Sequence, residues 1–380
     1  MKIIHLADTH LGFRQFSGKL DPDRKLNQRE CDVYAVWHRS IDIAIERNVD
    51  AVIHAGDLFD SARPSPRALS EAIDGFAKLR DAGIPVVAIA GNHSTPRFRS
   101  GGSVFEVLER FGVQAAWREP HTFKIGDVAF HAVPHESQAA QLQDDIRALT
   151  PDASASANVL MLHAGLDAVP APGYGEVNAI SLGAEVLVDA PFDYIAMGHL
   201  HRFQAPQVNA IYPGSIERLD FGDVVGDKTV LEIDLSLPAG ATGFVTRHPL
   251  ATRPLIDRIV TCNGFDQAAV VGGVQQALEG EALDGAVVRV RLEELGRDVW
   301  GALDFGRLDD LFADCLHHQI QVGRSGLQTG SDSESQRAEL QFDSWARERI
   351  PSGLDAEAVI AIAQNHLADA AANEVVEESD

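Results

Sequence analysis

The sequence has little of what marks a disulfide-bonded or membrane-spanning protein. Its three cysteines, Cys31, Cys262 and Cys315, are far apart and odd in number, which argues against a disulfide framework and a CxxC metal site. No apolar run approaches the roughly 18 residues that a membrane-spanning helix needs. The apolar stretch within residues 1–8 is too short for a signal peptide and reads as a first strand. We therefore expect a cytoplasmic protein in a reducing compartment, with no membrane partner.

Basic residues are also scarce. The chain has 32 Lys and Arg against 56 Asp and Glu, a net charge of −24. This balance argues against a nucleic-acid partner, because phosphate backbones attract basic surfaces. However, part of the negative charge is concentrated in residues 331–380, and most basic residues are Arg, which binds phosphate in a bidentate manner. The charge disfavours DNA binding but does not decide it.

The sequence contains no internal repeat, no Walker-type phosphate loop and no GxGxxG dinucleotide motif. What it contains is a short alternation of apolar runs and helical spacing over its first hundred residues. We predict strands at 1–8, 51–55 and 84–89 and helices at 29–47, 65–83 and 101–111. This order predicts right-handed βαβ units with functional residues at the carboxyl ends of the strands.

Beyond residue 111 the pattern changes to shorter strands. These are predicted at 122–125, 128–133, 159–162, 194–197 and 210–212, with helices at 137–149 and 182–188 and a hairpin at 229–235 and 243–248. Four parts follow from the composition. We expect a first domain at 1–250, a small α+β domain at 251–325, a polar linker at 326–339 and a helical segment with an acidic tail at 340–380. In the small domain we predict strands at 256–261 and 286–292 and helices at 266–278 and 303–316.

Residues with metal-ligand or proton-transfer chemistry stand directly after the predicted strands. They are Asp8, His10, Asp57, Asn92, His93, His163, His199 and His201. Carboxylate, amide and imidazole ligands suit divalent ions such as Mn, Fe or Zn. Seven of these eight residues could hold two ions as ligands if one carboxylate bridges. Two ions about 3.5–4 Å apart stabilise both the attacking and the leaving oxygen of an in-line displacement at phosphorus.

Each of these residues also has an ordinary structural explanation. Asp57 after Gly56 could be a turn or helix-cap residue, and the pair His199 and His201 could be structural. His5 and His54 lie inside apolar strands, so we interpret both as core histidines. Five further histidines lack a paired partner and are interpreted as surface or structural residues: His121, His131, His135, His317 and His318. The joint occurrence of the main set after successive strands favours a site.

Several short motifs resemble those of a known family. Asp8-x-His10, Gly56-Asp57, Gly91-Asn92-His93, His163 and Gly198-His199-x-His201 resemble the calcineurin-like metallophosphoesterases. Residues 5–12, 56–59, 63–66 and 212–222 are similar to the SbcD/Mre-type DNA repair exonucleases, the nuclease partners of an SMC-like ATPase. The resemblance covers residues 1–250 well and 256–325 more loosely, where the family has a capping domain. It implies a four-layer α/β/β/α sandwich with a small α+β capping domain and a C-terminal helical tail.

The resemblance also implies roles for individual residues. One metal would be held by Asp8, His10, Asp57 and His201, and a second by Asp57, Asn92, His163 and His199, with Asp57 bridging. A water activated by the two ions would attack phosphorus. The two ions are expected to be Mn, with Fe, Mg or Zn as alternatives. Candidate phosphate or DNA contacts, which could equally be solvated loop charges, are Arg97, Arg99 and Arg202.

His93 would be the catalytic residue, contacting the phosphate or protonating the leaving oxygen. The residue after it departs from the family pattern. Relatives usually have an acid there that can orient the histidine, and this chain has Ser94. The substitution predicts a weaker proton donor.

These features predict a DNA exo/endonuclease of double-strand-break repair that works with an SbcC-type SMC-like ATPase. One alternative is a metallophosphodiesterase for nucleotides or other small phosphodiesters. Another is a protein that binds DNA ends or the ATPase with weak or no catalysis. A homodimer through first-domain helices is a further expectation, and Val33, Val36 and Trp37 could form its interface or pack the core. Residues 340–371 could dock the ATPase or pack on the chain itself.

Overall fold

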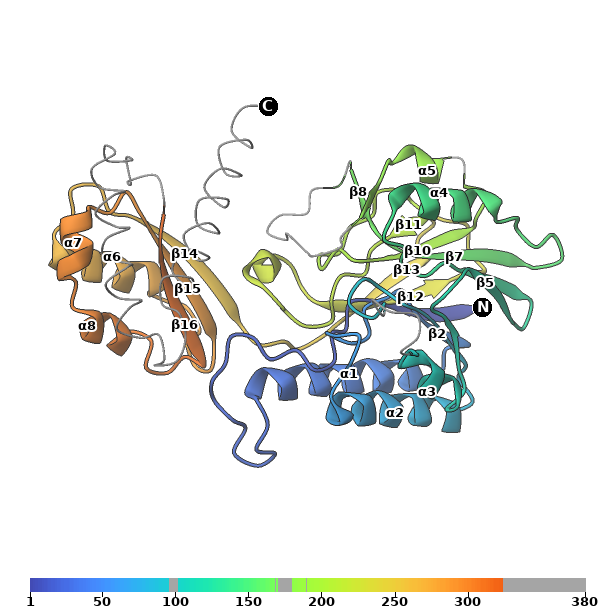
Figure 1. Ribbon diagram of the computed structural model, residues 1–380, viewed down its shortest axis with the longest axis horizontal. Coiled ribbons are helices and arrows are strands. Elements are labelled where there is room, and N and C mark those ends of the chain that lie inside the picture. Colours follow the sequence, from blue (N-terminus) through green and yellow to red (C-terminus); the bar gives the residue numbers. More distant parts are fainter. Residues whose placement is uncertain (96–101, 168, 170–179, 189, 324–380) are drawn as a thin grey trace, which may run out of the picture. The chain divides into compact units, whose positions relative to one another are not determined.

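The computed structural model describes residues 1–95, 102–167, 169, 180–188 and 190–323. The chain divides into two units, Met1–Val322 and Gly323–Asp380, and the elements below all belong to the first (Figure 1). The predicted linker at 326–339 and the helical segment at 340–380 lie outside the described residues. Arg97 and Arg99 lie outside them as well.

A six-stranded sheet is the first of two large sheets in the structure. Its strands, in spatial order, are β13 (Val245–Pro249), β12 (Thr229–Asp234), β1 (Lys2–Leu6), β2 (Ala51–His54), β3 (Val86–Ile89) and β4 (Val113–Ala116). The four strands β1 to β4 are parallel, and β12 returns antiparallel beside β1. Strand β4 was not predicted from the sequence, because its run of four residues is short and only partly buried.

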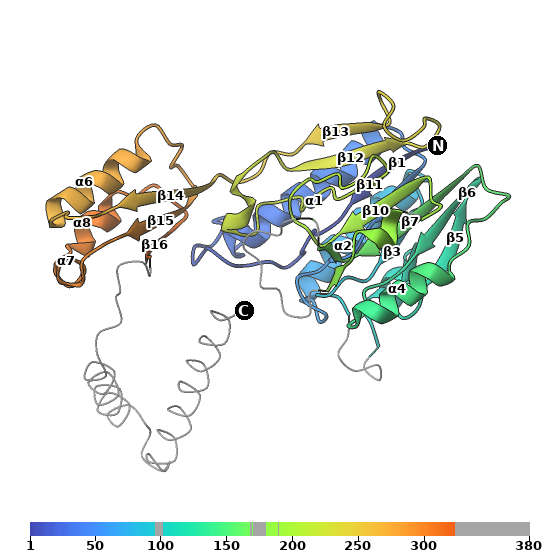
Figure 2. The same cartoon turned by 90° about the horizontal axis from the view of Figure 1, so that it is seen from above.

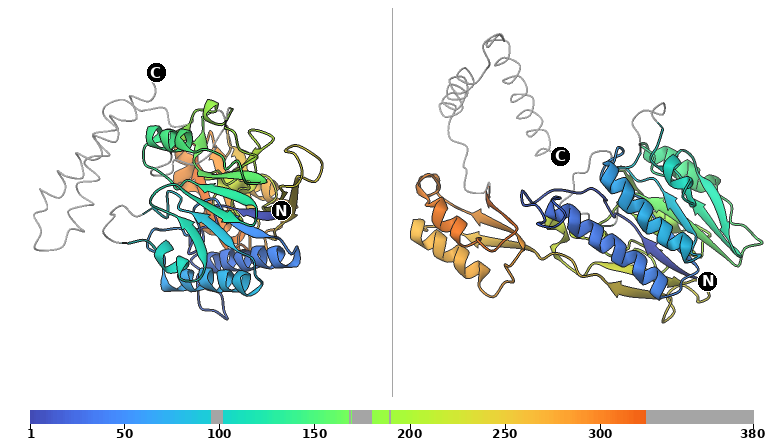
Figure 3. Two further views of the ribbon diagram at one scale, coloured as in Figure 1. Left: turned by 90° about the vertical axis from the view of Figure 1, so that its right-hand side faces the viewer. Right: turned by 90° about the horizontal axis from the view of Figure 1, so that it is seen from below.

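Two long helices cover the outer face of this sheet (Figures 1 and 3). Helix α1 (Gln28–Glu46) begins at Asn27, whose side chain accepts from two main-chain amides, and α2 (Pro66–Asp81) begins at the Ser65 cap. Both confirm the predicted helices. The predicted helix at 101–111 is shorter than expected, since α3 covers only Phe105–Glu109.

The apolar residues of α1 that could have formed a dimer interface pack the core instead. Val33 and Trp37 are fully buried and Val36 is 5% exposed. The Trp37 indole donates to the Glu71 carbonyl at 3.0 Å, and its ring meets Phe76 edge-on at 5.3 Å. Their burial is therefore satisfied within one chain.

A five-stranded sheet faces the first one (Figure 2). Its strands, in spatial order, are β11 (Ala210–Ile211), β10 (Tyr194–Gly198), β7 (Ala157–His163), β6 (Val128–Ala132) and β5 (His121–Ile125). Ile53 and Val87 of the first sheet share one buried cluster with Phe130, Val159 and Tyr194 of the second. Helices α4 (Ala139–Ala148) and α5 (Glu185–Val188) pack on the outer face, next to a small pair formed by β8 (Gly165–Leu166) and β9 (Ser181–Leu182). The predicted α/β/β/α sandwich is confirmed.

Residues 255–322 form a separate three-stranded parallel sheet with helices packed on one face. The elements are β14 (Leu255–Thr261), α6 (Gln267–Leu278), β15 (Val287–Glu293), α7 (Arg297–Ala302), α8 (Phe305–Asp310) and β16 (His317–Val322). The predicted helix at 303–316 is wrong in length. Its sequence breaks into the short α8 and a turn, and the strand that follows was not predicted.

No helix among the described residues is both long and apolar enough to cross a membrane.

Candidate metal centre

The chemically active residues meet where strands of the two sheets end. Residues 8 and 10 follow β1, residue 57 follows β2, residues 92 and 93 follow β3, His163 closes β7, and residues 199 and 201 follow β10. The ends of β1 and β2 run side by side, since Asp8 N donates to Gly56 O and His10 N to Asp57 O, both at 3.0 Å. The two sheets are joined at this edge because His199 N donates to both carboxylate oxygens of Asp8 at 3.0 Å.

Four of these residues have a left-handed backbone. The φ angles are 51° for Asp8, 49° for His10, 52° for Asp57 and 102° for His199. Each such residue costs of the order of 1–3 kcal/mol and persists only where the surroundings hold it. The strain turns successive side chains toward one point, which ordinary strand geometry with alternating side chains does not do.

Two motif glycines allow the strand ends to approach closely. A Cβ on Gly91 would lie 2.3 Å from Asp57 Oδ1, and a Cβ on Gly198 would lie 1.9 Å from Ala55 O. No side chain fits at either position. Glycine is therefore required before Asn92 and before His199, because the neighbouring atoms leave no room for a Cβ.

His163 lies at the centre of one ligand set. Its Nε2 is 3.0 Å from Asp57 Oδ2, 2.9 Å from Asn92 Oδ1 and 4.0 Å from Asp8 Oδ1, and all four side chains are buried. Burial alone would raise the pKa of Asp57, but His163, with His10 and His93, holds it well below its ordinary value. Burial lowers the pKa of His163, and Asp57 raises it by more, to about 9. The Nε2 atom of His163 thus lies at the point where three oxygen ligands converge.

A second set consists of Asp8, His10 and His201, whose ligand atoms lie within 4.8 Å of one another. The rings of His10 and His201 are 5.1 Å apart. Burial raises the pKa of the Asp8 carboxyl group, partly offset by His163 and His201. Among the described residues, the buried Nε2 of His10 has no hydrogen-bond partner. A buried lone pair of this kind is suited to a cation.

Three of the imidazoles have an oxygen at their other ring nitrogen. Nδ1 of His10 is 3.2 Å from Asp60 Oδ1, Nδ1 of His163 is 2.8 Å from Ala55 O, and Nδ1 of His201 is 3.5 Å from Asp223 Oδ2. Oxygen partners at Nδ1 fix the ring and leave Nε2 for a metal, which is the usual outer arrangement of histidine ligands. The donor set therefore fits divalent cations.

Asp223 belongs to a buried ion pair behind His201. It lies in the 3-10 helix η2 (Phe221–Val224), and its Oδ1 is 3.1 Å from Lys228 Nζ. Burial raises the pKa of Asp223, but Lys228 and His201 bring it well below its ordinary value. Lys228 Nζ also donates to His201 O at 2.7 Å. The pair therefore holds both the ring and the main chain of His201.

His93 lies beside the ligand sets and differs from them in its contacts. Its main-chain N donates to Asp57 Oδ1 at 2.9 Å, its Nδ1 is 3.1 Å from Asp60 O, and its ring is 4.7 Å from that of His10. Ser94 is buried, and its Oγ has no hydrogen-bond partner in the described part of the chain. The His93 ring is thus anchored by residue 60.

Of the three candidate phosphate contacts, only Arg202 is described. Its Nε donates to Gly222 O at 2.6 Å. It lines a cavity of about 210 Å³ together with Phe203 and Arg247, and the Arg247 guanidinium lies 4.2 Å from the Phe203 ring. These contacts do not test whether Arg202 binds phosphate, so that role stays a prediction.

The histidines outside the main set are mostly structural. His5 and His54 are confirmed as core residues: burial lowers the pKa of each to about 3, and they bond to Tyr194 and Thr9. His135 is not a surface residue, because it is 6% exposed and its ring lies 6.5 Å from that of His163.

Sequence reasoning did not single out the outer partners Asp60, Asp223 and Lys228. Asp60 stands in the same loop as Asp57, three residues on, which was the one available signal. Asp223 and Lys228 carry no such mark, since only the fold brings them to His201.

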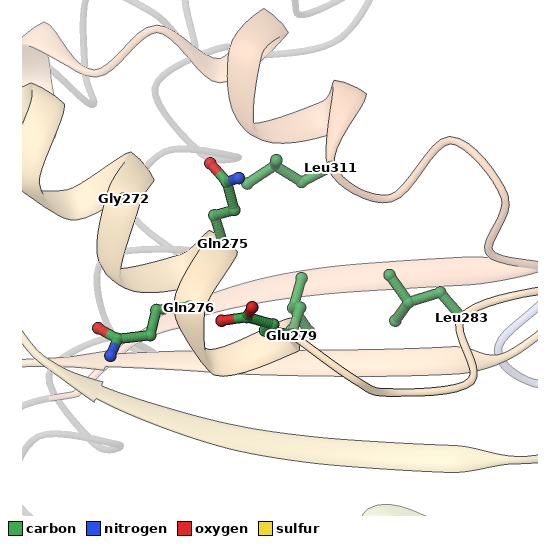
Figure 4. Close-up of a pocket in the computed structure, with 7 residues that line it drawn as sticks. Gly272, Gln275, Gln276, Glu279, Leu283 and Leu311 are labelled. Carbon is green, nitrogen blue, oxygen red and sulfur yellow. The ribbon is translucent and has the colours of Figure 1, made fainter.

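A larger cavity lies away from the strand ends, beside α6 (Figure 4). It measures about 490 Å³ and is lined by residues that include Gln275, Gln276, Glu279 and Leu311. Among the described residues that line it, Glu279 is the one titratable side chain. The described part of its lining offers no set of metal ligands.

Comparison with known proteins agrees with this arrangement. The calcineurin-like phosphoesterase family matches residues 1–203. The chain is 34% identical over 204 residues to a protein of Sulfurisphaera tokodaii named DNA double-strand break repair protein Mre11, covering 53% of this chain and 49% of that protein. A protein of the same name from Haloferax volcanii is 30% identical over 302 residues, covering 78% of this chain and 62% of that protein.

The chain spans about half the length of the first of these curated relatives. Among solved structures, a purple acid phosphatase from yellow lupin seeds has a TM-score of 0.39 at 12% identity, over 61% of this chain and 49% of that one. The family match covers just over half of the 380 residues and includes every strand end described above. The chain belongs to the calcineurin-like phosphoesterase family.

Proposed function

We propose that the chain is a metal-dependent nuclease that hydrolyses DNA phosphodiesters in double-strand-break repair, together with an SMC-like ATPase. The observation that carries the proposal is the convergence of two carboxylates, an amide and four imidazoles from five strand ends. The fourth imidazole, His199, has its ring 5.4 Å from that of His163, and the buried Nε2 of His10 lacks a protein partner among the described residues. Such a donor set is suited to two divalent ions and to chemistry at phosphorus.

The ligands divide into two groups that share Asp57. Asp8, His10, Asp57 and His201 would hold one ion, and Asp57, Asn92, His163 and His199 the other. Mn is the ion that we favour, with Fe, Mg or Zn as alternatives. When bound, the ions neutralise charge on the phosphodiester and lower the pKa of the attacking water.

The protein residues then position and move protons. Asp57 is suited to the shared position because its Oδ2 lies 3.0 Å from His163 while its Oδ1 accepts from His93 N. The His93 ring is anchored at Nδ1, so Nε2 is the atom that would protonate the leaving oxygen or contact the phosphate. This role survives the change to Ser94, because Asp60 O supplies the anchor.

DNA as the substrate is supported by the relatives, whose names place them in double-strand-break repair. The ATPase partner rests on the resemblance to SbcD/Mre-type exonucleases. Arg202 is proposed as a phosphate contact near His201, and a cytoplasmic homodimer is proposed on the same resemblance. The net charge of −24 implies that any DNA contact is local and strongly dependent on salt.

The test is a substrate panel with the purified full chain. Linear duplex DNA, single-stranded DNA and bis-p-nitrophenyl phosphate are incubated with Mn²⁺, with and without the ATPase. We expect metal-dependent cleavage of DNA and of the small diester, abolished by chelation.

Two outcomes would redirect the proposal. Hydrolysis of the small diester without DNA cleavage, even with the ATPase present, would support a small-molecule phosphodiesterase. Two bound Mn²⁺ per chain without turnover of any substrate would support a binding protein.

A further inference from the structure

We infer that Phe221 and Arg289 are positioning residues for His201, so that the small sheet of β14, β15 and β16 takes part in building the candidate metal centre. The small sheet holds Phe221, and the same short helix, η2, carries the Asp223 carboxylate that faces His201. The assignment of His201 as a ligand rests on the proposed function. The contacts that link the small sheet to His201 do not.

The side chain of Phe221 is buried against the small sheet. It is 6% exposed. Its buried partners come from β14, from β15 and from the residue before β16, namely Leu255, Val287 and Leu316. The Arg289 guanidinium lies 4.3 Å from the centre of the Phe221 ring, and Asp257 accepts from that guanidinium at 3.0 and 2.7 Å. The small sheet is therefore what keeps the Phe221 ring out of water.

Polar contacts at two other points hold the small sheet to the sandwich. Arg253 donates to Gly285 O at 2.6 Å, and the same guanidinium donates to Asp32 of α1 at 2.6 Å. Lys19, in the loop after β1, donates from Nζ to Cys315 O at 2.6 Å. The apolar contact at Phe221 is thus one of several that fix the small sheet beside η2.

The other side of η2 is held by the segment that contains His201. Arg202 donates to Gly222 O at 2.6 Å, and Asp223 Oδ2 lies 3.5 Å from His201 Nδ1. Within the helix, Asp223 N donates to Asp220 O at 2.9 Å. Phe221 and Asp223 stand in one turn of the chain, so a displacement of the ring also displaces the carboxylate that faces His201.

A shared element makes the two contacts interdependent. The small sheet favours the arrangement of η2 in which Asp223 faces His201. Metal binding at His201 must then favour the contact of Phe221 with the small sheet by the same factor, because coupling between two sites is reciprocal. Coupling therefore predicts an effect of the small sheet on the metal and an effect of the metal on the small sheet. Packing without coupling predicts neither.

The first experiment measures Mn²⁺ binding to the metal-stripped full chain by calorimetry. Phe221→Ala removes the ring, and we expect one of two sites to weaken by about 10-fold, the lower end of the range for outer partners. The lower end applies because Lys228 still holds Asp223. Phe221→Leu keeps an apolar side chain in the cluster and should bind Mn²⁺ within a few-fold of the wild type. Phe305→Ala removes the same ring from α8, where Phe305 is 43% exposed, and should have no effect.

The second experiment follows main-chain hydrogen exchange by mass spectrometry, with and without Mn²⁺. In the wild type, Mn²⁺ should slow exchange in residues 219–224 and also in residues 255–261 of the small sheet. In Phe221→Ala the protection of residues 255–261 should be lost, while that of the strand ends of the sandwich remains. If Phe221 only packed the small sheet, Mn²⁺ would leave exchange in residues 255–261 of the wild type unchanged.

Three results overturn the inference alone. They are Mn²⁺ binding to Phe221→Ala that matches the wild type, equal weakening of both sites in that variant, and no effect of Mn²⁺ on residues 255–261 of the wild type. A wild-type chain that binds no Mn²⁺ would overturn the proposed function as well. Neither measurement needs turnover, so the two failures are distinguishable.

Arg289→Met is the second variant, and it decides the question if Phe221→Ala does not fold. It removes the cation from the face of the Phe221 ring and keeps an apolar stem, while Arg291 still pairs with Asp257. We expect the same Mn²⁺ site to weaken by a few-fold, in keeping with the modest strength of a cation–π contact. Binding equal to that of the wild type would overturn the inference.

Discussion

The sandwich and the small sheet both contain parallel strands, but among the described residues only the strand ends of the sandwich bring candidate metal ligands together. In the sandwich, the ends of β1, β2, β3, β7 and β10 bring buried carboxylates and imidazoles together. In the small sheet, β14, β15 and β16 are also parallel, and Glu294 after β15 has a left-handed backbone with φ 56°, much like Asp57 with φ 52°. Yet Glu294 is exposed, and every metal-capable group found in the described residues lies in the sandwich.

This comparison shows that parallel strand order determines where the strand ends meet but does not by itself make a metal site. Two sheets facing each other bury the strand ends of the sandwich from both sides, whereas the small sheet has helices on one face. Buried carboxylates are tolerated only when paired, so Asp8 and Asp57 depend on the surrounding histidines or on cations. Among the described residues, the carboxyl ends of the small sheet's strands carry no imidazole, since His317 and His318 lie at the start of β16, and Glu294 after β15 is exposed.

The largest effect that separates the two regions should come from the shared carboxylate. Asp57→Asn should lower phosphodiester hydrolysis by more than the roughly 100-fold typical of outer-shell partners, because it would remove the ligand that we propose is common to both ions. Glu294→Gln is the matched change at a strand end of the small sheet and should leave the rate unchanged. Steady-state rates with Mn²⁺ measure both. Full activity of Asp57→Asn would show that the strand ends of the sandwich matter no more for hydrolysis than those of the small sheet.

The next effect concerns the buried ion pair behind His201. Lys228→Met leaves Asp223 buried without its cation, and we expect a loss of about 3–5 kcal/mol in the free energy of unfolding. Arg258→Met breaks the partly exposed ion pair between β14 of the small sheet and Glu281. It should lower the free energy of unfolding by at most about 1 kcal/mol. Denaturant unfolding measures both variants. Equal losses would show that burial of the pair at the site does not matter.

A pair of glycine changes should act in opposite directions. Gly91→Ala places a Cβ 2.3 Å from Asp57 Oδ1, so it should weaken Mn²⁺ binding and lower the midpoint of unfolding. Gly272→Ala in α6 meets no atom within 4 Å and should stabilise the chain by about 0.5–1 kcal/mol. Calorimetric Mn²⁺ titration and thermal unfolding follow the two changes. A neutral Gly91→Ala would contradict the close approach.

The smallest effect is a pH dependence that both regions should share. The hydrogen bond from Arg47 outweighs burial and, with His248, lowers the pKa of Glu232 from 4.5 to about 2. Because the folded pKa is depressed, its contribution to stability is complete above pH 4.5 and is lost as the pH falls toward 2. Glu232→Gln should flatten acid unfolding in that window.

Asp257 of the small sheet gives the counterpart. Burial raises the pKa of Asp257, but Arg289 and Arg291 bring it below its ordinary value. Asp257→Asn should therefore also reduce the loss of stability that occurs as the pH falls. An Asp257→Asn variant that is unchanged in acid, beside a flattened Glu232→Gln, would show that the ion pairs of the two regions are not equivalent.

The sequence alone determined most of the candidate metal set. Asp8, His10, Asp57, Asn92, His163, His199 and His201 were readable because each follows a short apolar strand, and parallel strands end at a common edge. Helices α1 and α2 were readable because their caps and apolar spacing are local features. Strands β4 and β16 were not predicted, since both are edge strands that are only partly buried and lack a continuous apolar run.

Only the tertiary structure decided how these residues are held. The left-handed backbone at Asp8, His10, Asp57 and His199 has no local signal, because non-glycine residues adopt it only where surrounding contacts enforce it. Asp60, Asp223 and Lys228 gain their roles from hydrogen bonds to side chains or carbonyls distant in sequence. The candidate ligands were therefore a property of the sequence. Their orientation is a property of the fold, because it depends on contacts between segments that no local pattern records.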